Sequence, residues 1–180
     1  MNIRLRPFTK EDIPLKIRWV NDPSVNRFLH YQLPLEYEKT LAWFHSLADR
    51  TDREDLVIEA DGAAVGTIGL LSINRSVRSA EFYIMLGEQS GKGIALEASK
   101  LLMKRAFCEK CLHRLYLYTE TENIRAQRLV EKLGFQKEGC LRDELIRSDK
   151  YVSRFLYSML KEEYDGFFEA HSADADLLPR

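Results

Sequence analysis

One stretch of the chain changes from a strand pattern to a helix pattern across a glycine-rich loop, and it limits the possible folds more than any other feature. It reads 84-IMLGEQSGKGIALEASKLLMKRAF-107. After the loop, apolar residues recur on one helical face at Ile94, Ala98, Leu101, Leu102 and Phe107. Glycine lets the backbone adopt positive φ and approach a ligand, and a helix N-terminus favours anions. The stretch predicts a strand, a loop and a helix, in which the loop either holds an anion or is a turn that binds nothing.

Two familiar phosphate-binding loops do not fit this stretch. A Walker A loop requires Ser or Thr directly after its lysine, whereas Lys92 is followed by Gly93. A dinucleotide-binding loop requires a third glycine where this chain has Leu96. The choice between an anion site and an empty turn therefore depends on the rest of the chain.

Length and composition favour one soluble domain. A chain of 180 residues can bury a core without disulfide or metal support. The net charge of −1 gives no indication of a nucleic-acid partner. The longest apolar stretch, 65–73, is far shorter than the ~20 residues of a membrane span, and the N-terminus shows no signal-peptide core. We therefore expect a cytoplasmic protein without nucleic-acid or membrane partners.

The cysteines agree with a reducing compartment. Cys108, Cys111 and Cys140 are odd in number and lack the spacing of a disulfide framework. The pair Cys108 and Cys111 has no second pair of zinc ligands and ends a helical pattern, whereas a redox pair would begin one. We predict core packing for this pair and expect no metal.

The remaining chain alternates between strand and helix patterns. Strand patterns span residues 3–7, 55–60, 63–73, 79–86, 114–119, 136–146 and 150–160, and further helical patterns span 9–20, 34–48 and 123–133. Thr9 and Asp12 form an acidic capping box, Asp61-Gly62 predicts a hairpin turn, and Gly134 predicts a helix end. We expect a single domain over residues 1–164, followed by an acidic tail, 165–180, that is loose or contacts a partner.

This order of elements, carrying Ser90-Gly91-Lys92-Gly93-Ile94-Ala95 and later Asn123 with Lys132-Leu133-Gly134-Phe135, resembles the GNAT acetyltransferases over roughly residues 3–160. Trp19-Val-Asn-Asp-Pro-Ser-Val25 and the segment that follows Asn123 are similar to the RimJ/RimL-like branch. The resemblance implies an α+β fold with a central mixed, mostly antiparallel sheet of about seven strands flanked by helices. It also implies acetyl-CoA as co-substrate and an N-acetyltransferase activity, and it leaves a homodimer open.

The resemblance assigns the glycine loop to the pyrophosphate of coenzyme A. The family pattern Gln/Arg-x-x-Gly-x-Gly/Ala is matched except at its first place, where Ser90 stands. Backbone amides of 91–95 would bind the pyrophosphate, and the strand before the loop would pair with pantetheine like an added strand. Asn123 either contacts the coenzyme or caps the following helix. The expected coenzyme contacts are Tyr83, Ile84, Met85, Leu86, Ser90, Gly91, Lys92, Gly93, Ile94, Ala95 and Asn123.

The catalytic groups that relatives use are replaced in this chain. The Tyr that often protonates the leaving thiolate is Val130, and a frequent Ser is Ala126. Tyr116, Tyr118 and Cys140 remain as donors, although each also fits a packed strand side chain. Glu81 is the catalytic candidate, because relatives often place a carboxylate on this strand to accept the amine proton through water. Its alternative is a solvent-facing strand residue.

The acceptor amine stays open at this stage. The resemblance implies substrate contacts from Asn21, Trp43 and Arg142, and an acceptor that is a protein N-terminus or a small amine such as an amino-sugar nucleotide. Polyamine or antibiotic acetylation is the alternative, as is a non-catalytic acyl-CoA sensor or a plain nucleotide-binding protein. Because the usual Tyr and Ser are absent, we hypothesise an acceptor with a pKa near ~8 rather than the ~10.4 of a lysine-like amine.

Overall fold

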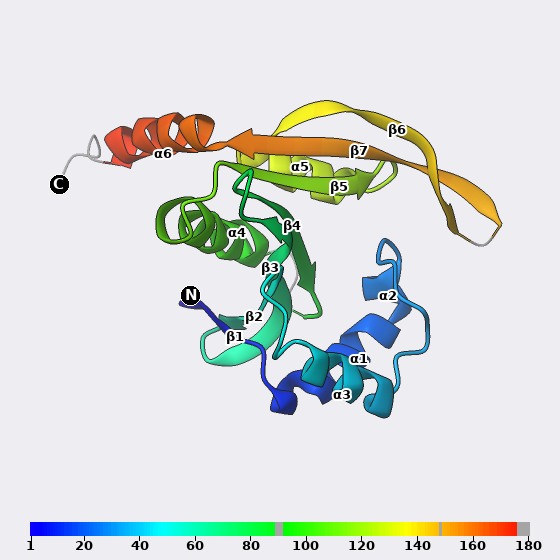
Figure 1. Cartoon of the computed structure of the whole chain (residues 1–180). Coiled ribbons are helices and arrows are strands. Elements are labelled where there is room, and N and C mark those ends of the chain that lie inside the picture. The colour runs from blue at the N-terminus through cyan, green and yellow to red at the C-terminus, as the bar shows by residue number, and fades with distance from the viewer. Residues whose placement is uncertain (89–91, 148, 176–180) are drawn as a thin grey trace. The chain divides into compact units, whose positions relative to one another are not determined.

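The computed structural model describes residues 1–88, 92–147 and 149–175, and the chain divides into two compact units. The first unit comprises Met1–Asn74 and Glu81–Met103, and the second comprises Arg75–Ala80 with the chain from Lys104 onward. A seven-stranded sheet provides the framework (Figure 1). Each unit is described by itself below.

The first unit contains four strands in the order β1-β2-β3-β4. They are β1 (Ile3–Pro7), β2 (Glu54–Ala60), β3 (Ala63–Asn74) and β4 (Ser79–Leu86), of which β4 enters this unit at Glu81. β2 pairs antiparallel with both β1 and β3. The turn between β2 and β3 has φ of 49° at Asp61 and 85° at Gly62. Positive φ at both residues matches the strand twist of a two-residue hairpin, which confirms the prediction from Asp61-Gly62.

The helices of the first unit begin with a capped turn. They are the 3₁₀ turn η1 (Lys10–Asp12), α1 (Ile13–Asn21), α2 (Pro23–Asn26), α3 (Tyr37–Ser46) and α4 (Ile94–Lys104). The Thr9 amide donates to the Asp12 carboxylate over 2.8 Å, so the capping box is confirmed. It opens η1, and α1 follows with Pro14 in its first turn, where no amide hydrogen is needed. The short α2 lies between two of the predicted helices, and α3 is shorter than its sequence pattern.

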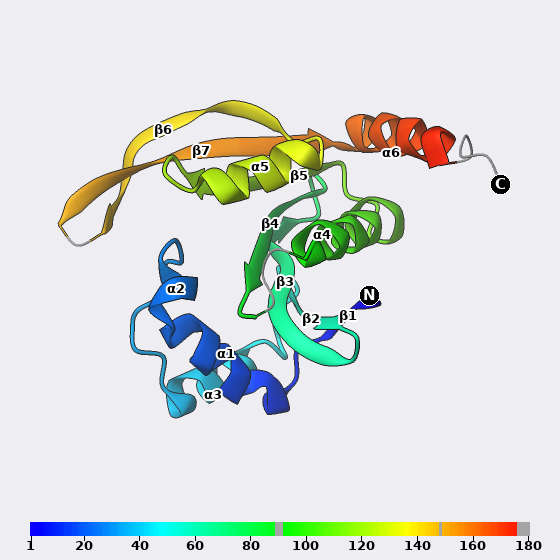
Figure 2. The ribbon, with the colours of Figure 1, turned by 180° about the vertical axis from the view of Figure 1, so that it is seen from behind.

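The core of the first unit lies on both faces of β2 and β3. Leu56, Val57 and Ile58 are consecutive and none is more than 3% exposed, so both faces of β2 are covered. Phe8 and Ile13 pack against Val57. α1 and α3 lie side by side, and α4 lies along β3 and β4 (Figures 1 and 2). This burial positions α1 and the start of α4 on a rigid sheet.

The second unit contains β5 (Arg114–Glu120), β7 (Lys150–Leu160) and β6 (Gln136–Arg147) in that order, all antiparallel. The β6–β7 register shifts between Leu141 and Leu145, which makes a bulge on β6. α5 (Ile124–Lys132) ends at Gly134, whose φ is 88°. The Gly134 amide donates to Glu131 O and the Phe135 amide to Val130 O, each over 3.0 Å. These two bonds form a Schellman motif and confirm the predicted helix end.

Two expectations about the second half of the chain differ from the structure. The residues after Tyr164 continue α6 (Lys161–Ala175), so they are helical as far as Ala175 rather than loose. Tyr164 at the start of this helix stacks on Phe107, with ring centroids 4.8 Å apart, and this contact holds the helix. Leu101 is 39% exposed because it points to one side of the apolar stripe of α4.

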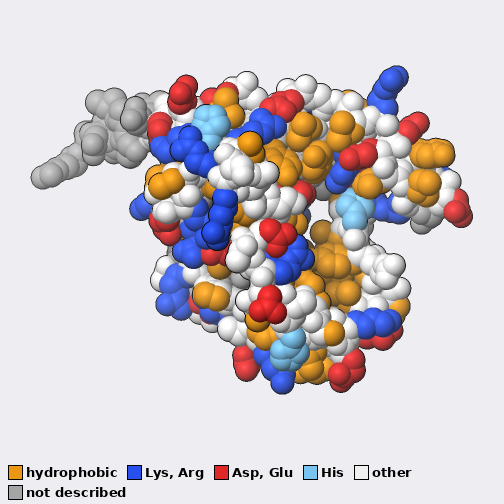
Figure 3. Space-filling view, viewed as in Figure 1, with side chains coloured by type: hydrophobic (Ala, Val, Ile, Leu, Met, Phe, Trp, Pro, Cys, Tyr) orange, Lys and Arg blue, Asp and Glu red, His pale blue; other side chains and the backbone are white. Residues whose placement is uncertain are grey.

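The prediction of core packing for the cysteines is also wrong. Cys108, Cys111 and Cys140 are free and exposed. Cys108 lies in a π-helix (η2, Arg105–Glu109), and its sulfur faces the Tyr164 hydroxyl at 3.9 Å. Among the described residues, no helix is both long and apolar enough to cross a membrane. Acidic and basic side chains are interspersed on the face shown in Figure 3.

Candidate functional site

The turn at the start of α4 is the place where the sequence predicts an anion site. Gly93 has φ of 79°, and its carbonyl accepts the Glu97 amide over 3.1 Å, which opens the helix. No atom lies within 4 Å of the place where a Gly93 side chain would begin, so the backbone conformation and not crowding requires glycine. The first amides of a helix have no partner within it, and the helix dipole adds positive potential at this end.

The predicted loop residues that the structure describes lie together at this helix end. Ile94 is 1% exposed and fixes the first turn in the core, while Lys92 is exposed. The Ser99 hydroxyl donates to Ala95 O over 2.6 Å, a bond within the first turns of the helix. Ser90 and Gly91 lie outside the described residues.

The predicted pantetheine strand, β4, is tied into the sheet by one of its side chains. The Tyr83 hydroxyl donates to Asp55 Oδ1 over 2.8 Å, and Asp55 also accepts two bonds from Arg53, at 2.6 and 2.7 Å. Burial, followed by the charge of Asp55, raises the pKa of Tyr83 well above its ordinary value. Tyr83 therefore serves the structure through its side chain, and the pairing of its backbone with pantetheine stays a prediction.

A glycine on the middle strand makes this contact fit. A Cβ on Gly69 would lie 2.0 Å from Glu54 O and 2.8 Å from the Tyr83 ring. The ring of Tyr83 therefore passes over Gly69 from β4 to reach Asp55 on β2. The sequence pattern alone did not reveal the contact of Tyr83 with Asp55 across Gly69. A glycine between two strongly apolar strand segments nevertheless indicates that another group approaches the backbone closely there.

The other predicted β4 residues divide between core and partly exposed positions. Met85 is 6% exposed and packs against Trp19 and Val20, so its side chain belongs to the core. Ile84 and Leu86 are partly buried. Glu81 is also partly buried, on the same side of the strand as Tyr83 by alternation. A proton relay through Glu81 requires contact with water, which a partly buried side chain retains. The catalytic role of Glu81 stays a prediction.

Two predicted substrate residues in the first unit make contacts within the protein. The Asn21 side chain donates to Leu35 O over 2.9 Å and accepts the Leu35 amide over 2.7 Å, which clamps the segment before α3 to the end of α1. The ring of Trp43 is covered by the Lys16 ammonium, 3.7 Å from the ring centroid. Both residues therefore shape this side of the unit, and their contact with a substrate stays a prediction.

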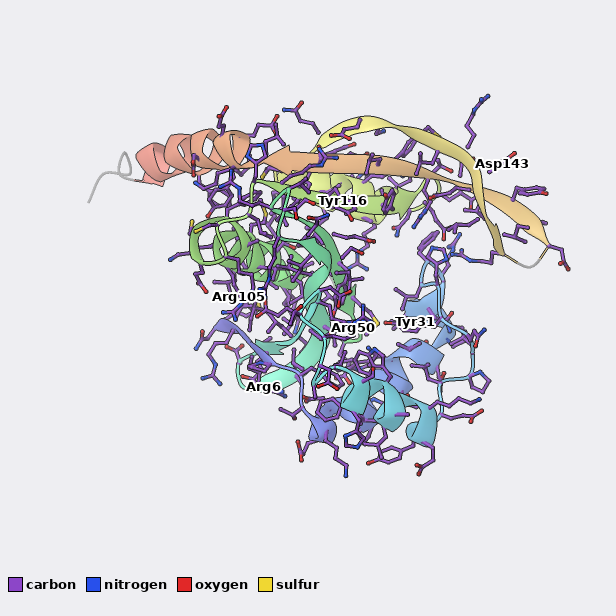
Figure 4. The ribbon with its side chains drawn as sticks, viewed as in Figure 1. Arg6, Tyr31, Arg50, Arg105, Tyr116 and Asp143 are labelled. Carbon is purple, nitrogen blue, oxygen red and sulfur yellow. The ribbon has the colours of Figure 1, made fainter. Side chains whose placement is uncertain are left out.

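Lys16 is a feature that sequence reasoning missed. It is 5% exposed, and its Nζ lies 5.5 Å from the Phe8 ring and 5.6 Å from Tyr31, which comes from the segment between α2 and α3 (Figure 4). Burial lowers the pKa of Lys16 to about 8. The signal was present in α1, where Lys16 stands on the apolar stripe of Ile13 and Val20.

A cavity of about 320 Å³ lies beside this cluster. It is lined by Phe8, Phe44, His45, Leu47, Ala48, Arg53 and Asp55. Its walls are mainly apolar, and its two charged residues pair with each other. Phe8 lines this cavity and also belongs to the group of aromatic rings around Lys16. All the residues that line the cavity lie in the first unit.

In the second unit, Asn123 caps α5. Its Oδ1 accepts the Ala126 amide over 3.1 Å, which is the structural alternative considered for this residue. Val130 is 2% exposed and belongs to the core. Arg142 is exposed in the β6 bulge. Contacts of Asn123 with coenzyme and of Arg142 with substrate stay predictions.

The tyrosines of β5 are held by their neighbours. The rings of Tyr116 and Tyr118 meet edge to face, with centroids 5.9 Å apart, and the Arg154 guanidinium lies 4.3 Å from the Tyr118 centroid. Tyr116 is labelled on β5 in Figure 4. These contacts fit packed strand residues, while Cys140, the third donor considered, is exposed.

Comparison with known proteins adds a sequence family and a fold. Residues 2–136 match the acetyltransferase (GNAT) domain family. The spermidine N(1)-acetyltransferase of Escherichia coli K12 is 32% identical over 166 residues, which cover 91% of this chain and 88% of that protein. The uncharacterized N-acetyltransferase p20 of Bacillus licheniformis is 28% identical, over 91% of this chain and 96% of that protein.

Solved structures agree with the sequence comparison. The crystal structure of spermidine N-acetyltransferase from Vibrio cholerae, in complex with CoA and spermine, matches with a TM-score of 0.84 and 26% identity, over 90% of this chain and 97% of that one. The predicted fold and enzyme class are thereby confirmed, whereas the narrower RimJ/RimL-like branch is not singled out by these relatives. The chain belongs to the GNAT family of N-acetyltransferases.

Proposed function

We propose that this enzyme transfers the acetyl group of acetyl-CoA to a primary amine of a polyamine. The observation that carries the acceptor is the similarity to the E. coli spermidine N(1)-acetyltransferase over 91% of this chain. The Vibrio cholerae relative that was solved with CoA and spermine supports the same pair of substrates. This reverses the order of our sequence expectations, in which a protein N-terminus or amino-sugar nucleotide stood first.

The chain supplies binding and a proton acceptor for this reaction. The first amides of α4, with Lys92 beside them, bind the pyrophosphate, and the β4 backbone aligns pantetheine. The neutral amine attacks the thioester carbonyl carbon and loses one proton as the amide forms, the carbon–sulfur bond breaks, and coenzyme A leaves as a thiolate that takes up one proton from solvent. Glu81 accepts the proton lost by the amine through water. Orientation of the two substrates provides most of the acceleration, because Val130 is buried and carries no transferable proton.

The absence of the usual Tyr, which is Val130 in this chain, favours a second class of acceptor, a weakly basic amine. Without the usual Tyr and Ser, a weakly basic amine suits the site, since a group with a pKa of ~8 loses its proton at pH 7 at a cost of ~1.4 kcal/mol, against ~4–5 kcal/mol for a pKa of ~10.4. Such an acceptor, for example a protein N-terminus, also fits the RimJ/RimL-like motifs around Trp19 and Asn123.

The exposed free cysteines support a cytoplasmic location for either activity.

An amine panel tests the acceptor. Coenzyme A release is measured with spermidine, spermine, putrescine, a peptide with a free N-terminus and an amino-sugar nucleotide, each over a range of concentrations. We expect the highest kcat/KM for spermidine or spermine. A higher kcat/KM for the peptide or the sugar nucleotide rejects the polyamine proposal. If coenzyme A binds but no amine in the panel is acetylated, the non-catalytic sensor is the better description.

Gly93→Val tests the coenzyme site. Valine is strained at φ of 79°, so the turn must rearrange and its amides leave the position that binds the pyrophosphate. We expect coenzyme A affinity to fall at least about tenfold, which is ~1.4 kcal/mol. Calorimetry on the folded variant measures the affinity, with Gly139→Ala on the exposed β6 as the matched control. Equal affinities for Gly93→Val and the wild type would remove the loop from the coenzyme site.

A further inference from the structure

The end of β4 is attached to α1 by an unusually close packing contact. A Cβ on Gly87 would lie 2.0 Å from the Trp19 ring, so the strand lies directly on the indole. Trp19 is 2% exposed and cannot move aside. The amides of Gly87 and Glu88 both donate to Val65 O, at 2.9 and 3.0 Å, so β3 holds the same two residues from the sheet side.

A polar contact fixes the direction of the chain at the same place. Trp19 Nε1 donates to Glu88 Oε1 over 3.1 Å, and Arg18 on the same helix also pairs with this carboxylate. The Glu88 side chain is 43% exposed and that of Arg18 is 62% exposed. Partly exposed pairs of this kind add little to stability. Their consequence lies in the conformation that they select for Gly87 and Glu88.

The position of this contact in the chain gives it a role in coenzyme binding. Glu88 follows β4, whose backbone is the proposed pantetheine strand, and precedes the turn of Lys92 and Gly93. A displacement at Glu88 is therefore passed to the end of β4, because Glu88 follows that strand after one residue. The same helix that carries Trp19 ends at Asn21, which clamps the segment before α3.

We propose that Trp19 and Glu88 are positioning residues that hold the end of β4 in the conformation that binds acetyl-CoA. They act on affinity for the coenzyme and not on the chemical step. This inference rests on the proposed function, since it assumes that acetyl-CoA binds along β4 and at the start of α4.

Two substitutions separate positioning from packing. Trp19→Phe retains a ring against Gly87 and removes the Nε1 donor. Glu88→Ala removes the acceptor at a partly exposed position, where folding should not suffer. We expect each to raise the KM for acetyl-CoA about fivefold or more, while kcat and the KM for the amine stay within about twofold. The double variant should resemble Glu88→Ala, because that change already removes the acceptor of the Trp19 hydrogen bond.

Matched controls complete the experiment. Glu162→Ala removes an exposed carboxylate from α6 and should leave the KM for acetyl-CoA unchanged. Trp43→Phe leaves Trp19 as the sole tryptophan of the two in the chain, so its fluorescence should respond to coenzyme A.

Two results overturn the inference. One is an unchanged KM for acetyl-CoA in both variants, and the other is a fall in Tm with parallel changes in kcat and both KM values, which marks a merely structural role. If Trp19→Phe does not fold, Glu88→Ala alone decides. Failure of the wild-type protein to bind coenzyme A in calorimetry would instead reject the proposed function.

Discussion

At the scale of single residues, Lys16 shows how a helix accommodates a charge on its buried face. The ammonium lies 3.7 Å from the Trp43 centroid, a distance at which cation–π attraction offsets part of the desolvation. Burial still dominates and lowers the pKa from 10.5 to about 8, against the attraction of Asp55. The charged form of Lys16 is therefore costly in the folded protein.

Lys16→Met should stabilise the protein in a pH-dependent manner. Below pH 8 both the folded and unfolded chains carry the charge, and the folded state bears the full cost of its burial. Between pH 8 and 10.5 the folded lysine loses its proton while the unfolded one keeps it, so wild-type stability rises with pH and the advantage of methionine shrinks. We expect a gain of about 1–3 kcal/mol at pH 7 that has largely disappeared by pH ~10.5. Urea unfolding at both pH values measures it.

Lys39→Met is the matched control, because Lys39 on α3 is 74% exposed. Its effect should stay within about 0.5 kcal/mol at either pH. A loss of stability in Lys16→Met at pH 7 would mean that the aromatic contacts outweigh desolvation.

At the scale of elements, three strands are joined by the row of Asp55, Gly69 and Tyr83. The missing side chain of Gly69 allows a tyrosine to cross one strand and reach the next. Gly69→Ala should therefore cost about 1–3 kcal/mol or more in unfolding free energy, because the Glu54 carbonyl that it meets is backbone and cannot yield without moving β2.

Gly139→Ala provides the comparison for Gly69→Ala. Gly139 also lies in a strand, but no atom lies within 4 Å of its Cβ position. Chemical denaturation of the two variants should differ in midpoint, with Gly139→Ala close to wild type. Equal midpoints would show that β2 or Tyr83 relaxes easily around a methyl group.

At the scale of the whole molecule, the proposed mechanism depends on a path that takes the proton from the amine. Glu81→Gln should lower kcat/KM by roughly 10²–10⁴ near neutral pH, which is the usual effect of losing a positioned base. The loss should shrink at high pH, where free amine accumulates. Initial rates between pH 6 and 9 measure it, with Glu162→Gln at an exposed position of α6 as control. Activity equal to wild type across this range would mean that Glu81 is a solvent-facing strand residue without a catalytic role.

Local patterns predicted most elements because each depends on near neighbours. The Asp61-Gly62 turn, the Thr9 capping box and the end of α5 at Gly134 follow from residues within one turn of each other. The reach of Tyr83 over Gly69 and the contact of Trp19 with Glu88 join residues far apart in sequence, and no local period encodes them. The cysteines were misplaced because apolar character indicates burial only on average.

The bulge on β6 has a consequence for association between molecules. β6 is the last strand in the sheet order, so one row of its backbone groups faces outward along an edge. A regular edge of twelve residues is a template for strand pairing with another chain and for aggregation. The bulge between Leu141 and Leu145, with Asp143 at φ of 52°, interrupts that row, and Arg142 and Glu144 place charges of both signs beside the break. The bulge therefore hinders pairing of the exposed edge of β6 with strands of other chains.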